Sequence, residues 1–231
     1  MSEKSSYEIH YAEYDKWFDD FPTVFASELR AIEQVLPPPG DWIEIGVGTG
    51  RFASALGIPI GIEPCEQMAA LARSRGIEVI AGRAEALPLR DACVDAVFLI
   101  TVLCYVPALG RALEEVHRVL RPSGYAIIAT VPRTSPIGNI YASAGPEDPF
   151  FYDAILRTPQ ELADAMREAC LPVDRASQTL FDSPDRANKH VEDPREGHDR
   201  GSFVVLRGRK RPSAPCPAAK RDAPAGEAAS A

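Results

Sequence analysis

The chain has 231 residues, of which 45% are hydrophobic and 25% are charged, and its formal net charge at pH 7 is −8. This composition is typical of a folded globular protein, and the length suits one full domain with extensions. The negative charge disfavours a general basic surface for nucleic acid, because phosphate backbones carry the same sign. No nucleic-acid partner is therefore expected.

Residues 1–40 are predicted to form helices that carry many aromatic side chains. Between positions 11 and 21, aromatic residues recur at spacings of three and four, as one face of a helix requires. The N-terminus lacks the apolar stretch of a signal peptide, and the longest apolar run, 96–106, is too short to cross a bilayer. We therefore expect a cytoplasmic protein without membrane contact. The aromatic N-terminal segment is predicted to act as a lid over the site.

Residues 41–208 alternate short apolar runs with amphipathic segments, which indicates an α/β domain. Near-continuous apolar strands that alternate with helices favour a doubly wound, mostly parallel sheet with helices on both faces. Strands are predicted at 42–45, 59–63, 77–82, 94–101, 125–131, 173–181 and 202–207, and helices begin near 51, 64, 109 and 158.

Two further segments are predicted to lie largely outside regular helices and strands. Residues 132–157 are rich in proline, glycine and aromatic residues and are predicted to form a loop or insertion near the site, whereas 182–201 is predicted to be a polar loop. Residues 209–231 are dominated by proline, alanine, serine and lysine, and are predicted to be a disordered tail.

A glycine-rich turn joins the strand at 42–45 to the following helix. Its glycines, at 46, 48 and 50, allow a tight turn and a close approach to a ligand. A dinucleotide fingerprint would place its last glycine at 51, where this chain has Arg51. Glu44 would repel a pyrophosphate and attract an ammonium group. A nicotinamide-dependent oxidoreductase is therefore the alternative rather than the main interpretation.

Glu63 ends the second predicted strand, where a carboxylate can accept hydrogen bonds from both hydroxyls of a ribose. The segment 82–89 follows the third strand, and a nucleobase could lie there. The pattern thus indicates a nucleoside that carries an ammonium group.

Four stretches together resemble the class I S-adenosylmethionine-dependent methyltransferases, and most nearly the small-molecule enzymes related to quinone-biosynthesis methyltransferases. They are EIGVGTGRF, GIEPCEQMAALAR, GRAEALPLRDACVDAVFLITVLCYV and EEVHRVLRPSG. The resemblance covers residues 7–207 and is densest at 42–124. It implies a Rossmann-like fold with a seven-stranded sheet whose last strand is antiparallel, S-adenosyl-L-methionine as cofactor, and a small-molecule methyl acceptor.

The resemblance also implies which residues bind the cofactor. Glu44 and the glycine loop would hold the methionine part, Glu63 the ribose, and Cys65 and Met68 would lie near the adenine edge. No metal site is expected. The full expected cofactor set is Glu44, Gly46, Gly48, Gly50, Glu63, Pro64, Met68, Ala84, Glu85 and Thr101.

The acceptor side is predicted from position alone, with Tyr14 as a lid over the cofactor and Tyr105 on the wall of the acceptor pocket. Because a sulfonium is a good leaving group, alignment of the reactants can supply much of the rate, and no catalytic triad is expected. A non-catalytic cofactor-binding or regulatory protein and a methyltransferase acting on a protein or metalloid remain alternatives, and the oligomeric state is not determined by the sequence. The acceptor-side candidates are Tyr11, Tyr14, Thr101, Cys104, Tyr105 and Tyr141.

Overall fold

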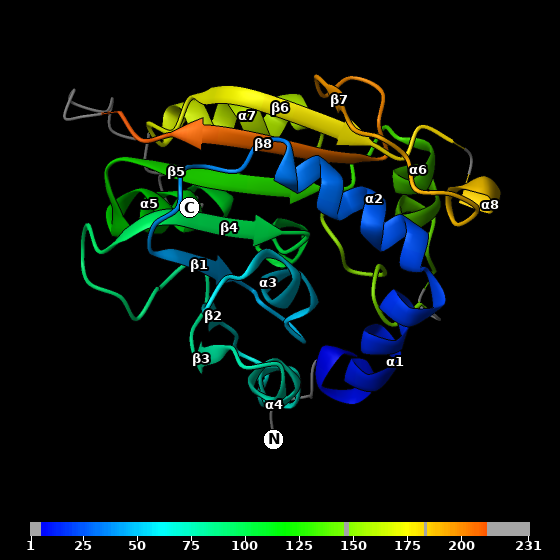
Figure 1. Cartoon of the computed structure of the whole chain (residues 1–231), viewed down its shortest axis with the longest axis horizontal. Coiled ribbons are helices and arrows are strands. Elements are labelled where there is room, and N and C mark those ends of the chain that lie inside the picture. Colours follow the sequence, from blue (N-terminus) through cyan, green and yellow to red (C-terminus); the bar gives the residue numbers. More distant parts are fainter. Residues whose placement is uncertain (1–5, 146–147, 183, 212–231) are drawn as a thin grey trace, which may run out of the picture.

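The computed structural model describes residues 6–145, 148–182 and 184–211. In this part of the chain, one eight-stranded sheet has the order β3-β2-β1-β4-β5-β8-β6-β7 (Figure 1). Strands β1 to β5 pair in parallel, whereas β8 lies antiparallel between β5 and β6. The strands are Trp42–Ile45 (β1), Ile60–Ile62 (β2), Glu78–Ile80 (β3), Val94–Ile100 (β4), Leu120–Thr130 (β5), Val173–Thr179 (β6), Arg195–Glu196 (β7) and Phe203–Arg209 (β8).

Helices cover both faces of this sheet, with α5 and α7 behind it and α2 and α3 in front of it in Figure 1. Helix α1 lies beside the carboxyl ends of the strands, at the right of that view. The helices are Ser6–Asp20 (α1), Pro22–Glu33 (α2), Arg51–Leu56 (α3), Glu66–Ser74 (α4), Leu109–Val119 (α5), Pro136–Ala142 (α6), Pro159–Glu168 (α7) and Pro184–Ala187 (α8), with a short 3₁₀ helix at Leu103–Tyr105.

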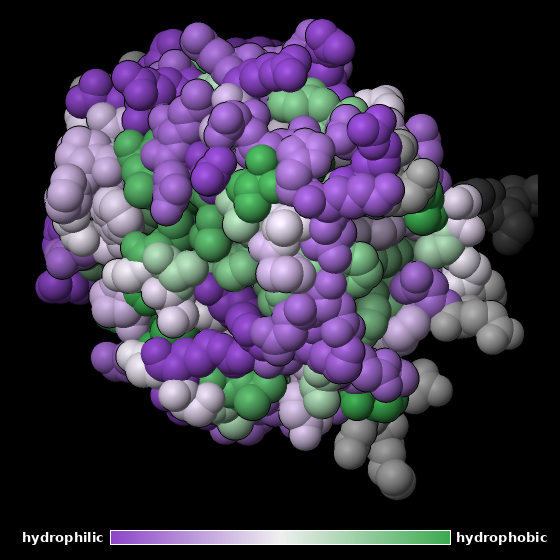
Figure 2. All heavy atoms as spheres, turned by 45° about the vertical axis from the view of Figure 1, so that its right-hand side comes forward, coloured by the Kyte–Doolittle hydropathy of each residue, from purple (hydrophilic) through white to green (hydrophobic). Residues whose placement is uncertain are grey.

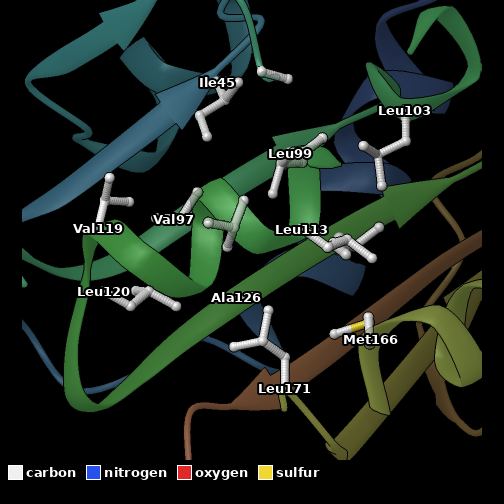
Figure 3. Close-up of a cluster of buried hydrophobic side chains, with 14 of the residues drawn as sticks. Ile45, Val97, Leu99, Leu103, Leu113, Val119, Leu120, Ala126, Met166 and Leu171 are labelled. Carbon is white, nitrogen blue, oxygen red and sulfur yellow. The ribbon is translucent and has the colours of Figure 1, made fainter. Parts of the chain in front are cut away.

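Strand β4 shows why the sheet is covered on both faces. Alternate residues of a strand point to opposite faces, and from Ala96 to Ile100 of β4 both sets are apolar and buried. Val97 and Leu99 pack against Leu113 of α5 in the core of one face (Figure 3), while Phe98 belongs to the core of the other face. The continuous apolar run thus fixes β4 in the middle of the molecule.

The doubly wound α/β fold expected from the sequence is confirmed, with two differences of detail. The sheet has eight strands rather than seven, because Arg195–Glu196 forms a short edge strand inside the predicted loop 182–201. The segment 132–157 is not entirely irregular, because Ser135 caps helix α6 by accepting a hydrogen bond from the Gly138 amide at 3.0 Å. Most of the predicted tail, 212–231, lies outside the described residues. Within them, no helix has the length and apolar character required to span a membrane.

Candidate functional site

A cavity of about 600 Å³ lies at the carboxyl ends of β1, β2, β4 and β5. Helices α1, α2 and α6 and the segment 150–156 complete its walls. Figure 2 shows the molecule turned so that the right-hand side of Figure 1 comes forward, and hydrophobic residues gather there between hydrophilic ones. A cavity of this size suits a small molecule or a cofactor.

The glycine loop after β1 adopts a conformation that side chains disfavour. Gly46, Gly48 and Gly50 have φ angles of +67°, +54° and +82°. A Cβ on Gly46 would lie 2.2 Å from Val102 Cγ2. A Cβ on Gly48 would lie 3.4 Å from Met68 Cε and 3.8 Å from Tyr14 Cε1, so this glycine lines the cavity in contact range of both side chains.

Glu63 holds this loop to the end of β2. Its carboxylate oxygens accept hydrogen bonds from the backbone amides of Gly48 and Cys65, each at 2.9 Å. Glu63 is 7% exposed and lines the cavity. Burial raises the pKa of its carboxyl, and the two amide donors oppose this rise. Each oxygen still has a lone pair for a further donor, such as a hydroxyl of a ligand.

Glu44 lies behind the loop rather than on the cavity wall. It is 2% exposed, and its carboxylate accepts a hydrogen bond from the Ala53 amide in α3. Its Oε2 is buried without a hydrogen-bond partner, and burial followed by the charge of Glu63 holds the pKa of this carboxyl well above its usual range. Such a group is stabilised by a positive charge nearby.

An ion-pair cluster fastens helix α1 over the glycine loop. Arg51, the first residue of α3, donates to both carboxylate oxygens of Asp15 at 2.9 and 2.8 Å and to Asp19 at 2.8 Å. Arg75 donates to Asp15 at 2.8 Å and to the Thr49 carbonyl at 2.8 Å. Partial burial raises the pKa of Asp15, but hydrogen bonds from the two arginines bring it down to about 2.

Aromatic rings close the cavity between α1 and the segment 150–156. The Tyr7 ring lies 5.6 Å from Tyr14, 5.1 Å from Tyr105 and 5.6 Å from Phe150, between centroids. The Tyr105 hydroxyl donates to the Phe150 carbonyl at 2.9 Å. Burial raises the pKa of all three tyrosine hydroxyls, so they stay protonated at neutral pH.

The carboxyl end of β4 is strained where it meets the cavity. Thr101 has a φ of +53° although it carries a branched side chain, a feature that clusters at functional sites. The Cys104 thiol lies 3.1 Å from the Thr101 carbonyl, and burial raises the pKa of this thiol to about 12. Cys104 is therefore a protonated wall residue rather than a nucleophile.

Most of the expected residues meet at this one cavity. Of the expected cofactor set, all line the cavity except Glu44 and Gly50, and of the acceptor-side candidates all line it except Tyr11. Helix α1 is kinked at His10 (φ −107°, ψ 19°), and Tyr11, which directly follows the kink, does not line the cavity. The functional roles of these residues stay predictions.

Sequence reasoning missed several cavity residues, above all Tyr7, Glu28 and Phe150. Tyr7 lies two helical turns before Tyr14, and this spacing alone could have added it to the aromatic face. Glu28 lies four residues after Val24 and four before Ile32, on the buried face of α2. An acid in an apolar stripe was the available signal for it.

Comparison with known proteins supports a cofactor-binding site of the methyltransferase type. The profile of a family described as "Methyltransferase domain" matches residues 43–128. An uncharacterised protein of Methanocaldococcus jannaschii is 36% identical over 198 residues, which is 86% of this chain and 95% of that protein. The ubiquinone/menaquinone biosynthesis C-methyltransferase of Rubrivivax gelatinosus is 31% identical over 103 residues, or 41% of each chain.

A solved structure from Thermotoga maritima is also similar. It is described as a SAM-dependent methyltransferase, possible histamine N-methyltransferase, and is 41% identical with a TM-score of 0.86. The match covers 89% of this chain and 99% of that one. Together these similarities favour methyl transfer over the nicotinamide-dependent alternative.

The glycine loop gives a stability prediction. We expect Gly46→Ala to lower the free energy of unfolding in urea by about 1–3 kcal/mol more than Gly57→Ala does. Both positions have positive φ, but a Cβ at Gly57 meets nothing within 4 Å, so the control measures backbone strain alone, about 1–2 kcal/mol. Equal losses in the two variants would show that the contact with Val102 relaxes freely.

The ion pairs of Asp15 give a second prediction. Asp15→Asn should speed amide hydrogen exchange in α1 and lower stability by about 1–2 kcal/mol, because Arg75 loses its carboxylate partner and Arg51 keeps only that of Asp19. Asp20→Asn is the matched control, since the Asp20 carboxylate pairs with Lys16 at the surface of the described structure.

The same bonds predict a pH dependence. Because the pKa of Asp15 falls from 3.8 to about 2 on folding, its contribution is present above pH 4 and is lost as the pH falls from about 4 to 2. If amide hydrogen exchange in α1 were equally fast in the Asp15→Asn variant and in the parent protein, the role of Asp15 as the anchor of α1 would be contradicted.

Proposed function

Because the chain belongs to the S-adenosylmethionine-dependent methyltransferases, we propose that it methylates a small molecule bound in the cavity described above. The observation that carries this proposal is the cavity itself, which has about 600 Å³ and is walled by aromatic rings from α1 and the segment 150–156. The description of the Thermotoga maritima structure as a possible histamine N-methyltransferase also supports a small acceptor.

The residues present fit the cofactor of this family. S-adenosylmethionine supplies a methyl group on a positively charged sulfur. Glu63 would accept hydrogen bonds from its ribose hydroxyls, because both carboxylate oxygens keep a free lone pair in the cavity. Gly48 lines the cavity at the loop. The unpartnered Oε2 of Glu44 is buried behind the loop, where a positively charged sulfonium would favour the ionised form of this carboxyl. Met68, Ala84 and Glu85 also line the cavity, and the adenine base of the cofactor would lie beside them.

The remaining wall residues would orient the acceptor and exclude water. Tyr14 lies over Gly48, and its Cε1 would be 3.8 Å from a Cβ at that position. The hydroxyls of Tyr14 and Tyr105 stay protonated, so they serve as hydrogen-bonding groups rather than bases. Alignment of acceptor and methyl group is the main catalytic contribution expected of such a site.

The cofactor site can be tested by calorimetry with S-adenosylhomocysteine. Glu63→Ala should weaken binding about 10- to 100-fold, because hydrogen bonds to a charged acceptor are lost, at about 1.5–3 kcal/mol. Glu66→Ala is the control, since Glu66 lies three residues away and pairs with Arg73 at the surface. Equal affinity in both variants and the parent would contradict the assignment of Glu63.

The size of the acceptor can be tested with methyl-labelled S-adenosylmethionine. The protein is incubated with a cell extract, and the extract is then divided by ultrafiltration. We expect the transferred label in the filtrate, because the cavity accommodates small molecules. Label recovered only in the retained protein or nucleic acid would refute the small-molecule proposal, and no transfer to any fraction would favour a non-catalytic role.

A further inference from the structure

Glu28 is a buried acid that neither the fold nor the cofactor site accounts for. It lies in the middle of α2, is 6% exposed and lines the cavity. Within the described part of the chain, no hydrogen-bond donor or basic side chain pairs with its carboxylate. Burial of an unpaired carboxyl is unfavourable, and an apolar residue would stabilise α2 better at this position. The carboxylate of Glu28 is therefore available to a ligand in the cavity.

The surroundings of Glu28 are aromatic. After burial, the charge of Glu28 is among the factors that raise the pKa of Tyr14 and Tyr141, so its carboxylate lies near both side chains. Tyr141 stacks on Phe151 with 3.6 Å between ring centroids and 7° between ring planes. Trp17 also lines the cavity. Such walls favour flat rings, and they favour cations placed over ring faces.

The other acids of the cavity differ from Glu28. Glu63 binds the backbone amides of Gly48 and Cys65, and Glu85 lies 3.9 Å from Arg83. The third, Glu8, also has an interaction partner. Arg83 is the only basic side chain among the described cavity residues, and its side chain is 69% exposed. The interior around Glu28 thus offers one isolated acid, aromatic rings and no competing cation.

We propose that Glu28 binds the methyl acceptor, and that this acceptor is a small molecule with a protonated amine attached to a flat aromatic or azole ring. This inference rests on the proposed function and specifies the substrate class of that same cavity. The ammonium group provides the opposite charge that Glu28 lacks, and the ring packs against the tyrosines. Burial raises the pKa of Glu28 to about 8 in the free protein, and a bound ammonium lowers it again, so the ion pair forms at neutral pH.

The test uses matched ligands that differ only by an amine or a hydroxyl group. These are 2-phenylethylamine and 2-phenylethanol, tyramine and tyrosol, tryptamine and tryptophol, and histamine and histaminol. Each is titrated by calorimetry into protein saturated with S-adenosylhomocysteine. At least one amine should bind about tenfold or more tightly than its alcohol, which corresponds to about 1.4 kcal/mol.

The variants assign this preference to one residue. Glu28→Gln keeps the size of the side chain and should remove the preference for the amine, with unchanged affinity for S-adenosylhomocysteine as evidence of folding. Glu33→Gln is the control, because Glu33 is an exposed glutamate in the same helix. An amine preference that persists in Glu28→Gln would overturn the proposal.

Proton release gives a second readout on the unmodified protein. At pH 7, Glu28 is mostly protonated when unpaired, since its pKa is about 8. Amine binding should therefore release close to one proton, measured by repeating the titration in buffers of different ionisation enthalpy. Tyr14 from α1 and Tyr141 from α6 face Glu28, and the pKa of each is raised, so neither contributes protons at pH 7.

Two outcomes would overturn the proposal and leave the proposed function intact. One is binding of S-adenosylhomocysteine without binding of any of the four amines. The other is amine binding without proton release and without preference over the alcohols. Failure to bind S-adenosylhomocysteine would instead contradict the proposed function itself.

Discussion

The carboxylate of Glu63 is the interaction on which the site depends. By accepting from the Gly48 and Cys65 amides, it joins the loop after β1 to the loop after β2. The left-handed backbone at Gly48 directs its amide to the buried Glu63 carboxylate, whereas the Gly46 amide donates to the Ile62 carbonyl at 2.8 Å. The side chain that shapes the loop also faces the cavity. A ligand therefore meets a group whose position the fold has already fixed.

Arg51 shows how one residue separates two classes of binding loop. In the sequence it stands where a dinucleotide fingerprint has its last glycine, and this difference argued against a nicotinamide cofactor. In the structure its guanidinium binds Asp15 and Asp19 of α1. In a dinucleotide site, the last glycine of the fingerprint allows the helix to pack closely against the strand. Here the same position carries Arg51, which anchors helix α1 over the cavity. The sequence pattern could disfavour one function, but the partner of the arginine depends on tertiary contacts.

The sequence predicted the parts of the fold that depend on local periodicity. The apolar run of β4 and the glycine spacing at 46–50 are contiguous patterns, and they led to the sheet, the loop and Glu63. The cavity walls come from distant segments, so Tyr7 and Phe150 meet only through the path of the chain. Glu28 is intermediate. Its place between Val24 and Ile32 predicts a buried position, but only the structure shows a cavity at that point.

The acidic side chains of the cavity favour positively charged ligands. A buried carboxylate is stable only when a cation or several donors compensate it. Glu63 has two amide donors, Glu44 has one, and Glu28 has neither donor nor cation among the described residues. An anionic dinucleotide would add two phosphates to this acidic interior and would raise its electrostatic energy further. A sulfonium near the glycine loop and an ammonium beside Glu28 would lower it. In the proposed binding mode the acids would select both ligands by the same physical rule, because both ligands carry positive charge.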